Sequence, residues 1–516
     1  MLKKQIISID TMLDSMKNRI KPAWKIAFFA TMAWGVVCHF VALIGNYPNH
    51  DALKRFYDAS PVPLISLGRW FLFPARSLSS PFDMSWIAGM LTILYYCIIV
   101  ILLVELFCVS SKAGIVCISG IIITFPVVAS TFSHMFTADG YAIAFILAVL
   151  PVLLVEKYKW GFIFGAIPLA LSLGTYQAYL SVTLVLGVFM LFRKIFSDIS
   201  FRNYMKEIGK YLVLLALAFL LYWAAMQITL RMYGIVLRDY QGIDSLANPL
   251  SAIYKLQGHA KQAWNKTWEM FTDSIISGRL SKAYLIVALA SCGVFIKKKA
   301  AYLKIWKVPF MVLQVAVIPF FLNSIAFFSG GEQVMLHLLT LSAYSFIFII
   351  AVLLNEKQFD GNTGAILRWL SILLTFGLCI KFVMTSNIAY RNLQQTYEKT
   401  YGLCLRVVDR LEQQPEFDYD DPVAFLSSGY SFTPSALREA KNYSSYHIRD
   451  MHGMTSNINA STAERMEAFM LINLGVELNI VPGDEIKETE QYMNMPAWPS
   501  ADCVAQIEDT WVVKFN

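Results

Sequence analysis

Residues 84–109 read MSWIAGMLTILYYCIIVILLVELFCV, a run in which Glu105 is the only charged side chain. The hydrocarbon core of a bilayer is about 30 Å thick, so an α-helix needs about 20 predominantly apolar residues to cross it. The run is long enough and apolar enough to do so. It predicts a membrane-spanning helix.

The composition of the whole chain agrees with this prediction. Of its 516 residues, 57% are hydrophobic and only 15% are charged, and the mean hydropathy is +0.52. Soluble domains contain about 25% charged residues, so this chain has too little polar surface to remain in water. The composition excludes a soluble multidomain enzyme, a disordered scaffold and a fibrous protein, and it leaves a polytopic membrane protein.

We expect a mainly α-helical protein with about eleven transmembrane helices. The candidate spans lie near 26–45, 84–109, 114–132, 141–155, 161–173, 178–192, 211–229, 283–296, 308–328, 337–354 and 369–386. Lys157 and Lys159 precede residues 161–192, and Arg193 and Lys194 follow them. Both ends of this stretch therefore prefer the cytoplasm, which predicts a hairpin rather than one long helix.

Lysine and arginine also predict the orientation, because cytoplasmic loops contain an excess of them. With the N-terminus inside, the inner segments contain 21 of these residues among 77, and the outer segments 11 among 111. We therefore expect a cytoplasmic N-terminus and an extracytoplasmic C-terminus in a multi-pass membrane protein. The N-terminus has no early apolar core, so no signal peptide is expected.

The composition changes from apolar to polar and acidic at about residue 387. This change divides the chain into a transmembrane domain, 1–386, and a second domain, 387–516. The second domain has no spanning run and contains 10 Lys and Arg against 19 Asp and Glu. We expect a small extracytoplasmic α/β domain that holds a glycan or caps the membrane site. The expected elements are strands at Val423–Leu426, Val476–Val481 and Trp511–Phe515 and a helix at Ser461–Leu474. Cys404 and Cys503 could form a disulfide in an oxidising compartment.

The first outer loop, residues 46–83, has the groups for chemistry at a membrane surface. Asp51 could take a proton from an acceptor hydroxyl. A cation at Lys54, Arg55 or Arg69 could neutralise the phosphate of a lipid-linked leaving group. The alternative is that these charges are solvated or contact lipid headgroups. The apolar stretch Leu64–Phe73 could lie flat in the interface, and two further carboxylates are present, Asp58 and Asp83.

The second outer loop and the tip of the hairpin add further candidates. Asp139 could bind a sugar hydroxyl, support a metal or share proton handling with Asp51, or it could only cap a helix beginning near Tyr141. His134 could contact substrate, although a surface histidine is more often hydrogen-bonded to protein. At the tip, Tyr176 could stack on a sugar or belong to an interfacial aromatic belt, and Gln177 offers hydrogen bonds.

Other ionisable residues and motifs limit the classes of function. Glu105 and Lys381 are almost the only charges inside the spans, where such residues are functional candidates by default, although Lys381 could reach the interface. No second His or Cys stands at ligand spacing from His134, so no zinc site is expected. The sequence contains no phosphate-binding loop, dinucleotide fingerprint or His-Glu-x-x-His motif.

Four segments together resemble the Gtr type-II serotype-converting glucosyltransferases, which are polytopic enzymes that modify bacterial O-antigen. The segments are His50-Asp51 with Gly68-Arg69-Trp70, Thr137 to Ala142, Ser172 to Ala178, and Met495-Pro496 with Trp511 to Lys514. The resemblance implies a GT-C-like fold, an outward-facing active site in the bacterial inner membrane and a sugar donor linked to polyprenyl phosphate. Glucose on undecaprenyl phosphate is the implied donor, and a lipopolysaccharide O-antigen or related surface glycan is the implied acceptor.

In GT-C-like enzymes an acidic residue of the first outer loop is the usual base, and this position corresponds to Asp51. Asp139 is similar to a second acidic position of the family, and Arg69 to the arginine of its Gly-Arg-Trp motif. The expected reaction is an inverting displacement in which Arg69, with Lys54 or Arg55, stabilises the leaving phosphate. A lipid monophosphate already leaves readily, so no metal or other cofactor is required, and a divalent metal near Asp51 and Asp139 stays an alternative.

Two other classes of function compete with this interpretation. An O-antigen polymerase or ligase would use a diphosphate-linked donor. A lipid-glycan transporter would need a path of ionised residues through the spans, and the scarcity of such residues favours chemistry at the surface.

Overall fold

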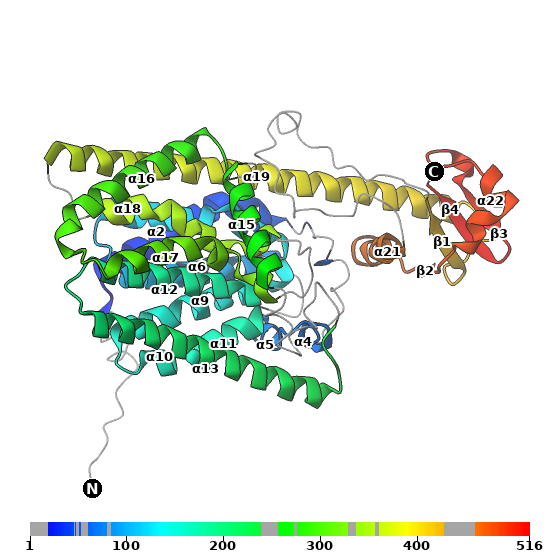
Figure 1. Cartoon of the computed structure of the whole chain (residues 1–516). Helices are drawn as coiled ribbons and strands as arrows, with labels where there is room; N and C mark the ends of the chain where they lie inside the picture. The colour runs from blue at the N-terminus through cyan, green and yellow to red at the C-terminus, as the bar shows by residue number, and fades with distance from the viewer. Residues whose placement is uncertain are drawn as a thin grey trace, which may run out of the picture.

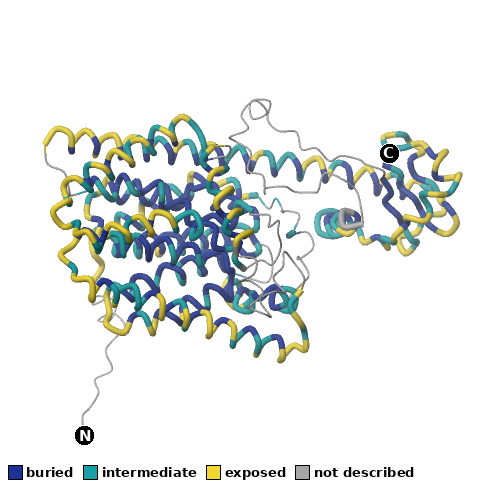
Figure 2. Tube along the Cα trace, in the orientation of Figure 1, coloured by how far each residue is buried: buried dark blue, intermediate teal, exposed yellow. Residues whose placement is uncertain are grey.

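A computed structural model describes residues 19–45, 47, 51–52, 60–79, 84–238, 256–272, 276–328, 337–356, 361–427 and 460–515. These residues form a helical body and, at the far end of one long helix, a small domain with a mixed sheet (Figure 1). Buried residues fill the centre of the body and the inside of the small domain (Figure 2). The mainly helical architecture is confirmed.

The body consists of helices that differ widely in length. In chain order they are α2 (Pro22–Ile44), α4 (Val62–Ile65), α5 (Leu72–Arg76), α6 (Ser85–Phe107), α7 (Lys112–Thr124), α8 (Pro126–Ser133), α9 (Met135–Lys157), α10 (Gly161–Phe164), α11 (Ala166–Thr175), η1 (Gln177–Tyr179), α12 (Leu180–Ile195), α13 (Phe201–Tyr233), α15 (Leu256–Thr272), α16 (Arg279–Lys299), η3 (Ala300–Tyr302), α17 (Lys307–Leu322), η4 (Ser324–Phe328), η5 (Leu338–Thr340), η6 (Ser342–Ile349), α18 (Ile350–Asn355) and α19 (Gly361–Glu412).

Within the described residues, seven helices are long and apolar enough to cross a membrane, and α7 with α8 would make an eighth. The α7–α8 pair is bent by 43°. Pro126 opens α8, and a proline restricts the residue before it and cannot donate a backbone hydrogen bond, which explains the bend. Three expected spans correspond to shorter apolar helical segments, Gly161–Thr175, Lys307–Leu322 and Ser342–Asn355. The multi-pass membrane architecture is confirmed, and the long helices number fewer than eleven.

The predicted hairpin at residues 161–192 is confirmed. Lys194, at the end of α12, forms an ion pair with Glu156 near the end of α9, with 2.7 Å between Nζ and Oε1. Residues 157 and 194 therefore lie at the same end of the body. The tip at Tyr176 lies at the opposite end, where its ring stacks on Tyr141 of α9.

A cluster of charges ties three helices together at the end of the body that holds Lys194. The Glu105 carboxylate of α6 binds Lys21, which precedes α2, at 2.7 Å, and it also binds Lys157 of α9. The indole N–H of Trp24 donates to the same carboxylate at 3.0 Å. Glu105, a functional candidate by sequence, therefore has a structural role.

The C-terminal domain is built on the end of α19, which runs through residue 387 without a break. Its further elements are β1 (Pro422–Leu426), α21 (Ala460–Leu474), β2 (Asn479–Ile480), η8 (Glu485–Glu488), α22 (Glu490–Asn494), η9 (Ala501–Cys503), β3 (Val504–Ile507) and β4 (Thr510–Lys514). The sheet order is β2-β1-β4-β3, with β1 parallel to both neighbours and β3 antiparallel to β4.

The predicted elements of this domain are largely present. Val423 pairs with Trp511 in the register of β1 and β4, and α21 contains the predicted helix. Of the predicted strand Val476–Val481 only Asn479–Ile480 forms β2. Cys404 and Cys503 are both buried and are not joined by a disulfide.

The Glu105 cluster gives a prediction about stability. Replacing Glu105 with Gln leaves two lysines beside a neutral side chain, and we expect a loss of about 1–3 kcal/mol because the carboxylate is partly buried. The midpoint of thermal unfolding in detergent should fall by several degrees. Asp198→Asn is the control, since Asp198 is highly exposed and 3.5 Å from Lys304. Equal midpoints for both variants would contradict the structural role.

Candidate active site

The Gly-Arg-Trp segment of the first outer loop is folded into the body. Gly68 follows α4 in the left-handed region with φ of +70°, and a Cβ at this position would stand 2.7 Å from the Tyr222 hydroxyl. Only glycine fits both restrictions without strain. Leu64 and Leu72 on either side of the segment are buried. The apolar side chains of this stretch therefore pack onto the body, and its position in the interface stays a prediction.

Two buried side chains hold the backbone of this segment. The Gln177 amide donates to the Leu67 carbonyl and to the Tyr222 hydroxyl, both at 3.1 Å. The Tyr222 hydroxyl donates to the Gly68 carbonyl at 3.2 Å. Gln177, which we expected to bind substrate, is thus buried at the hairpin tip and positions the loop.

The hairpin tip also orients Arg69. The Phe71 N–H donates to the Gly174 carbonyl at 2.7 Å, and a Cβ on Gly174 would stand 2.5 Å from the Trp70 indole. With the loop seated in this way, the Arg69 guanidinium lies 4.5 Å from the centre of the Tyr176 ring. This is a cation–π contact. Tyr176 in turn stacks on Tyr141 at 4.9 Å, so the predicted sugar-stacking residue supports Arg69.

Asp51 lies beside His134 at the beginning of α9. The distance from Asp51 Oδ2 to His134 Nε2 is 3.9 Å, and the side chains are 49% and 12% exposed. His134 Nδ1 is 2.9 Å from the Ser130 carbonyl. A carbonyl can only accept, so Nδ1 carries the proton of this hydrogen bond and Nε2 faces Asp51. The structure therefore pairs the predicted base with the histidine of the second outer loop.

Asp139 lies one turn inside α9 and is completely buried. The alternative that it caps the helix is wrong, because α9 begins at Met135, directly after α8, and His134 occupies the cap position. Its Oδ1 accepts from the Gly140 N–H at 2.8 Å, and Arg76 of α5 acts electrostatically on its carboxylate. A buried carboxylate needs such a cation. The sequence analysis did not single out Arg76, although it is the fourth basic residue of the first outer loop.

Several other candidates are placed differently. Lys54, Arg55, Asp58 and Asp83 lie outside the described residues. Lys381 is partly buried in α19 and reaches the beginning of α16, with its Nζ 2.7 Å from where a Cβ on Gly278 would be. Among the described residues, no group of three or more His, Cys, Asp or Glu side chains lies close enough to hold a metal ion.

Asp51, Arg69, His134 and Asp139 therefore lie at one end of the body. Asp139 lies one turn inside α9 and Lys157 is its last residue, so 18 helical steps separate them by about 27 Å. A half-exposed carboxylate can accept a proton, and an oriented guanidinium can bind an oxyanion. The fold and the site define a multi-pass membrane protein with carboxylate, imidazole and guanidinium groups at one end.

A family model described as "Glucosyl transferase GtrII" matches residues 40–355. This match covers more than half of the chain, which therefore belongs to the GtrII glucosyltransferase family. Every candidate residue from Asp51 to Gln177 lies within the matched region. Neither the curated proteins nor the solved structures include a match to this chain.

The close packing of the Trp70 indole against Gly174 gives a second prediction. A methyl group at Gly174 would displace the indole, and Arg69 would move away from Tyr176. We expect Gly174→Ala to lower glucosylation of lipopolysaccharide at least about tenfold, since displacing one oriented charged donor costs this much or more. The measurement is mass spectrometry of lipopolysaccharide from cells with matched protein levels. Gly293→Ala is the control, because a Cβ there meets nothing within 4 Å. Equal glucosylation in both variants would show that the packing of Trp70 against Gly174 is not needed for transfer.

Proposed function

We propose that the protein transfers glucose from undecaprenyl-phosphate-glucose to the O-antigen of lipopolysaccharide, at the outer face of the bacterial inner membrane. Membership of the GtrII family supports glucosyl transfer in a membrane. The finer proposal is carried by one observation, the presence of Asp51 beside His134 at the same end of the body as Arg69.

The proposed orientation places this end outside the cytoplasm. The opposite end holds the lysines that pair with Glu105, Glu156 and Glu207, and lysine-rich ends face the cytoplasm. Eleven crossings follow if the three shorter apolar segments cross together with the eight long spans. In this orientation the N-terminus is cytoplasmic, and the C-terminal domain lies in the periplasm.

The reaction is a single displacement with inversion. Asp51 accepts the proton of the acceptor hydroxyl as the hydroxyl oxygen attacks the anomeric carbon of glucose. The bond between that carbon and the phosphate oxygen breaks, and undecaprenyl phosphate leaves with the electron pair. Arg69 stabilises the charge that develops on the phosphate, with Lys54 or Arg55 as further cations. His134 Nε2 lies 3.9 Å from the Asp51 carboxylate, and His134 contacts the substrate beside this base.

Asp139 acts in this proposal as a positioning residue. It is fully buried, and the Ser79 hydroxyl, the Gly140 N–H and the charge of Arg76 all act on its carboxylate. Ser79 and Arg76 belong to α5 and the turn after it, so these interactions hold that segment against the first turns of α9, directly after His134. Gln177 and Tyr176 are positioning residues too, because Gln177 holds the loop that carries Arg69 and Tyr176 contacts its guanidinium.

The assignment of the base is tested by Asp51→Asn. Removing a general base lowers a rate about 10²–10⁴-fold, so we expect transfer of radiolabelled glucose from undecaprenyl-phosphate-glucose to lipopolysaccharide to fall at least about 100-fold in membranes. Asp198→Asn, at the opposite end, should retain wild-type transfer. Full activity of a stably folded Asp51→Asn protein would assign the base to another carboxylate. Failure of the wild type with a panel of monophosphate donors would refute the proposed donor class.

The chemistry as proposed needs no metal ion, because a phosphate monoester is already a good leaving group. We expect membranes treated with EDTA to transfer glucose at the untreated rate. A loss of transfer that Mg²⁺ or Mn²⁺ restores would instead assign a divalent ion to the reaction.

A further inference from the structure

Helix α15 carries a hollow that the proposed mechanism does not use. The hollow has a volume of about 470 Å³ and is lined by Trp264, Asn265, Trp268, Glu269 and Thr272. This volume is within the range of small-ligand sites, roughly 300–1,000 Å³. Trp264 and Trp268 are 55% and 68% exposed, although tryptophan is a side chain that folding normally buries.

The opposite face of α15 is fixed to the body. The Asn323 amide at the end of α17 donates to the Ala263 carbonyl at 3.0 Å and to the Thr267 hydroxyl at 2.9 Å. It also donates to the Tyr344 hydroxyl at 2.9 Å. Ala263 and Met270 are buried against the body. The two exposed indoles therefore stand on a helix whose orientation is set by a buried hydrogen-bond network.

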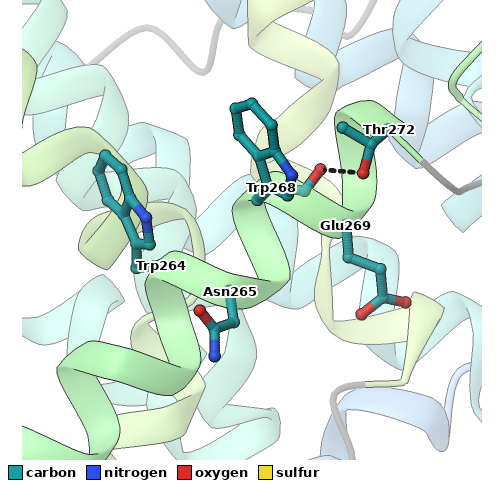
Figure 3. A pocket seen from close by; sticks show the side chains of 5 residues that line it. All are labelled: Trp264, Asn265, Trp268, Glu269 and Thr272. Carbon is teal, nitrogen blue, oxygen red and sulfur yellow. Dashed lines mark hydrogen bonds between the residues drawn. The ribbon is translucent and has the colours of Figure 1, made fainter.

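Helical spacing arranges the lining residues in two strips. Trp264 and Trp268 are four residues apart and lie on one face of α15, and Asn265 and Glu269 form the adjoining strip. Figure 3 shows the two indole rings projecting from one side of α15, with Asn265 and Glu269 projecting from its other side in this view. Glu269 also pairs with Lys266 at 3.0 Å.

This combination suits a carbohydrate. The C–H face of a pyranose ring is apolar and packs on the negative face of an aromatic ring, while its hydroxyl groups hydrogen-bond to amide and carboxylate oxygens. The amide and carboxylate beside the indoles distinguish this surface from one that faces lipid chains. In addition, α15 lies towards the same end of the body as α4 and α5 (Figure 1).

We propose that Trp264, Trp268, Asn265 and Glu269 form a subsite that binds the acceptor glycan while one of its sugars is glucosylated at Asp51. The inference rests on the proposed function, since it names the place where that function's acceptor is held. O-antigen is a polymer, so a subsite remote from the reacting hydroxyl can raise the local concentration of acceptor.

The test measures glycan binding separately from transfer. O-antigen oligosaccharide released from lipopolysaccharide is titrated into the detergent-purified full chain by calorimetry. We expect Trp264→Ala and Trp268→Ala each to weaken binding about tenfold, which is the size of one lost aromatic contact. Trp268→Phe should retain part of the affinity. Trp160→Ala is the matched control, because Trp160 is 54% exposed and follows α9 at the opposite end of the body.

Transfer kinetics provide the second readout. The tryptophan variants should raise the apparent KM for the acceptor with little change in kcat or in the KM for the donor. Wild-type affinity for the oligosaccharide in the Trp264→Ala/Trp268→Ala double variant would overturn the subsite. So would quenching of both indoles by brominated lipids in nanodiscs without displacement by glycan, since the occupant would then be the membrane. If no donor supports transfer, the proposed function fails, and the binding titration still decides the subsite.

Discussion

Backbone groups that are buried away from water must find hydrogen-bond partners inside the protein, and the Gly68-Arg69-Trp70 loop depends on this constraint. Its carbonyls at Leu67 and Gly68 are satisfied by Gln177 and Tyr222, which come from the hairpin tip and from α13. The two partners belong to different helices, so the loop can form only after those helices have packed. The position of Arg69 is therefore a property of the whole bundle rather than of its own loop.

The overall architecture was accessible from sequence because hydropathy and charge act locally. Long apolar runs predicted the long helices, and basic residues on both sides of 161–192 predicted the hairpin that the Lys194–Glu156 ion pair confirms. The strand at Val423–Leu426 and the helix at Ser461–Leu474 followed from patterns of single segments. The end of the transmembrane region could not be predicted in this way. Polar side chains replace apolar ones near residue 387, but α19 continues through this residue without a break.

The candidate site was harder to predict from sequence, because it depends on which helices and loops pack against one another. Sequence spacing offers Asp139 as the cap of a helix that begins near Tyr141, but α9 begins at Met135, so Asp139 lies inside the helix and is buried. Its cation, Arg76, lies more than sixty residues earlier, and only the packing of α5 on α9 brings them together. The network of Asn323, Thr267 and Tyr344 that fixes α15 is likewise a product of tertiary structure. No local pattern indicates it.

The body holds its charged side chains through two kinds of contact. At one end, carboxylates and ammonium groups neutralise each other, as in the cluster of Glu156, Lys194 and Glu207. All three N–H groups of the Lys307 ammonium also have partners there, because Nζ donates to the carbonyls of Ile195, Ser197 and Tyr302. At the other end, Arg69 is oriented by the face of Tyr176, a contact that leaves the positive charge in place.

The contact between Arg69 and Tyr176 bears on the proposed lipid-phosphate donor. A guanidinium held through an aromatic ring is oriented in advance and keeps its long-range attraction for an anion. The Lys157–Glu105 ion pair, which fastens α9 to α6, lies about 27 Å along α9 from the turn that carries Asp139. The Glu105 cluster and the candidate site therefore lie at opposite ends of one helix, and a substitution in one need not disturb the other.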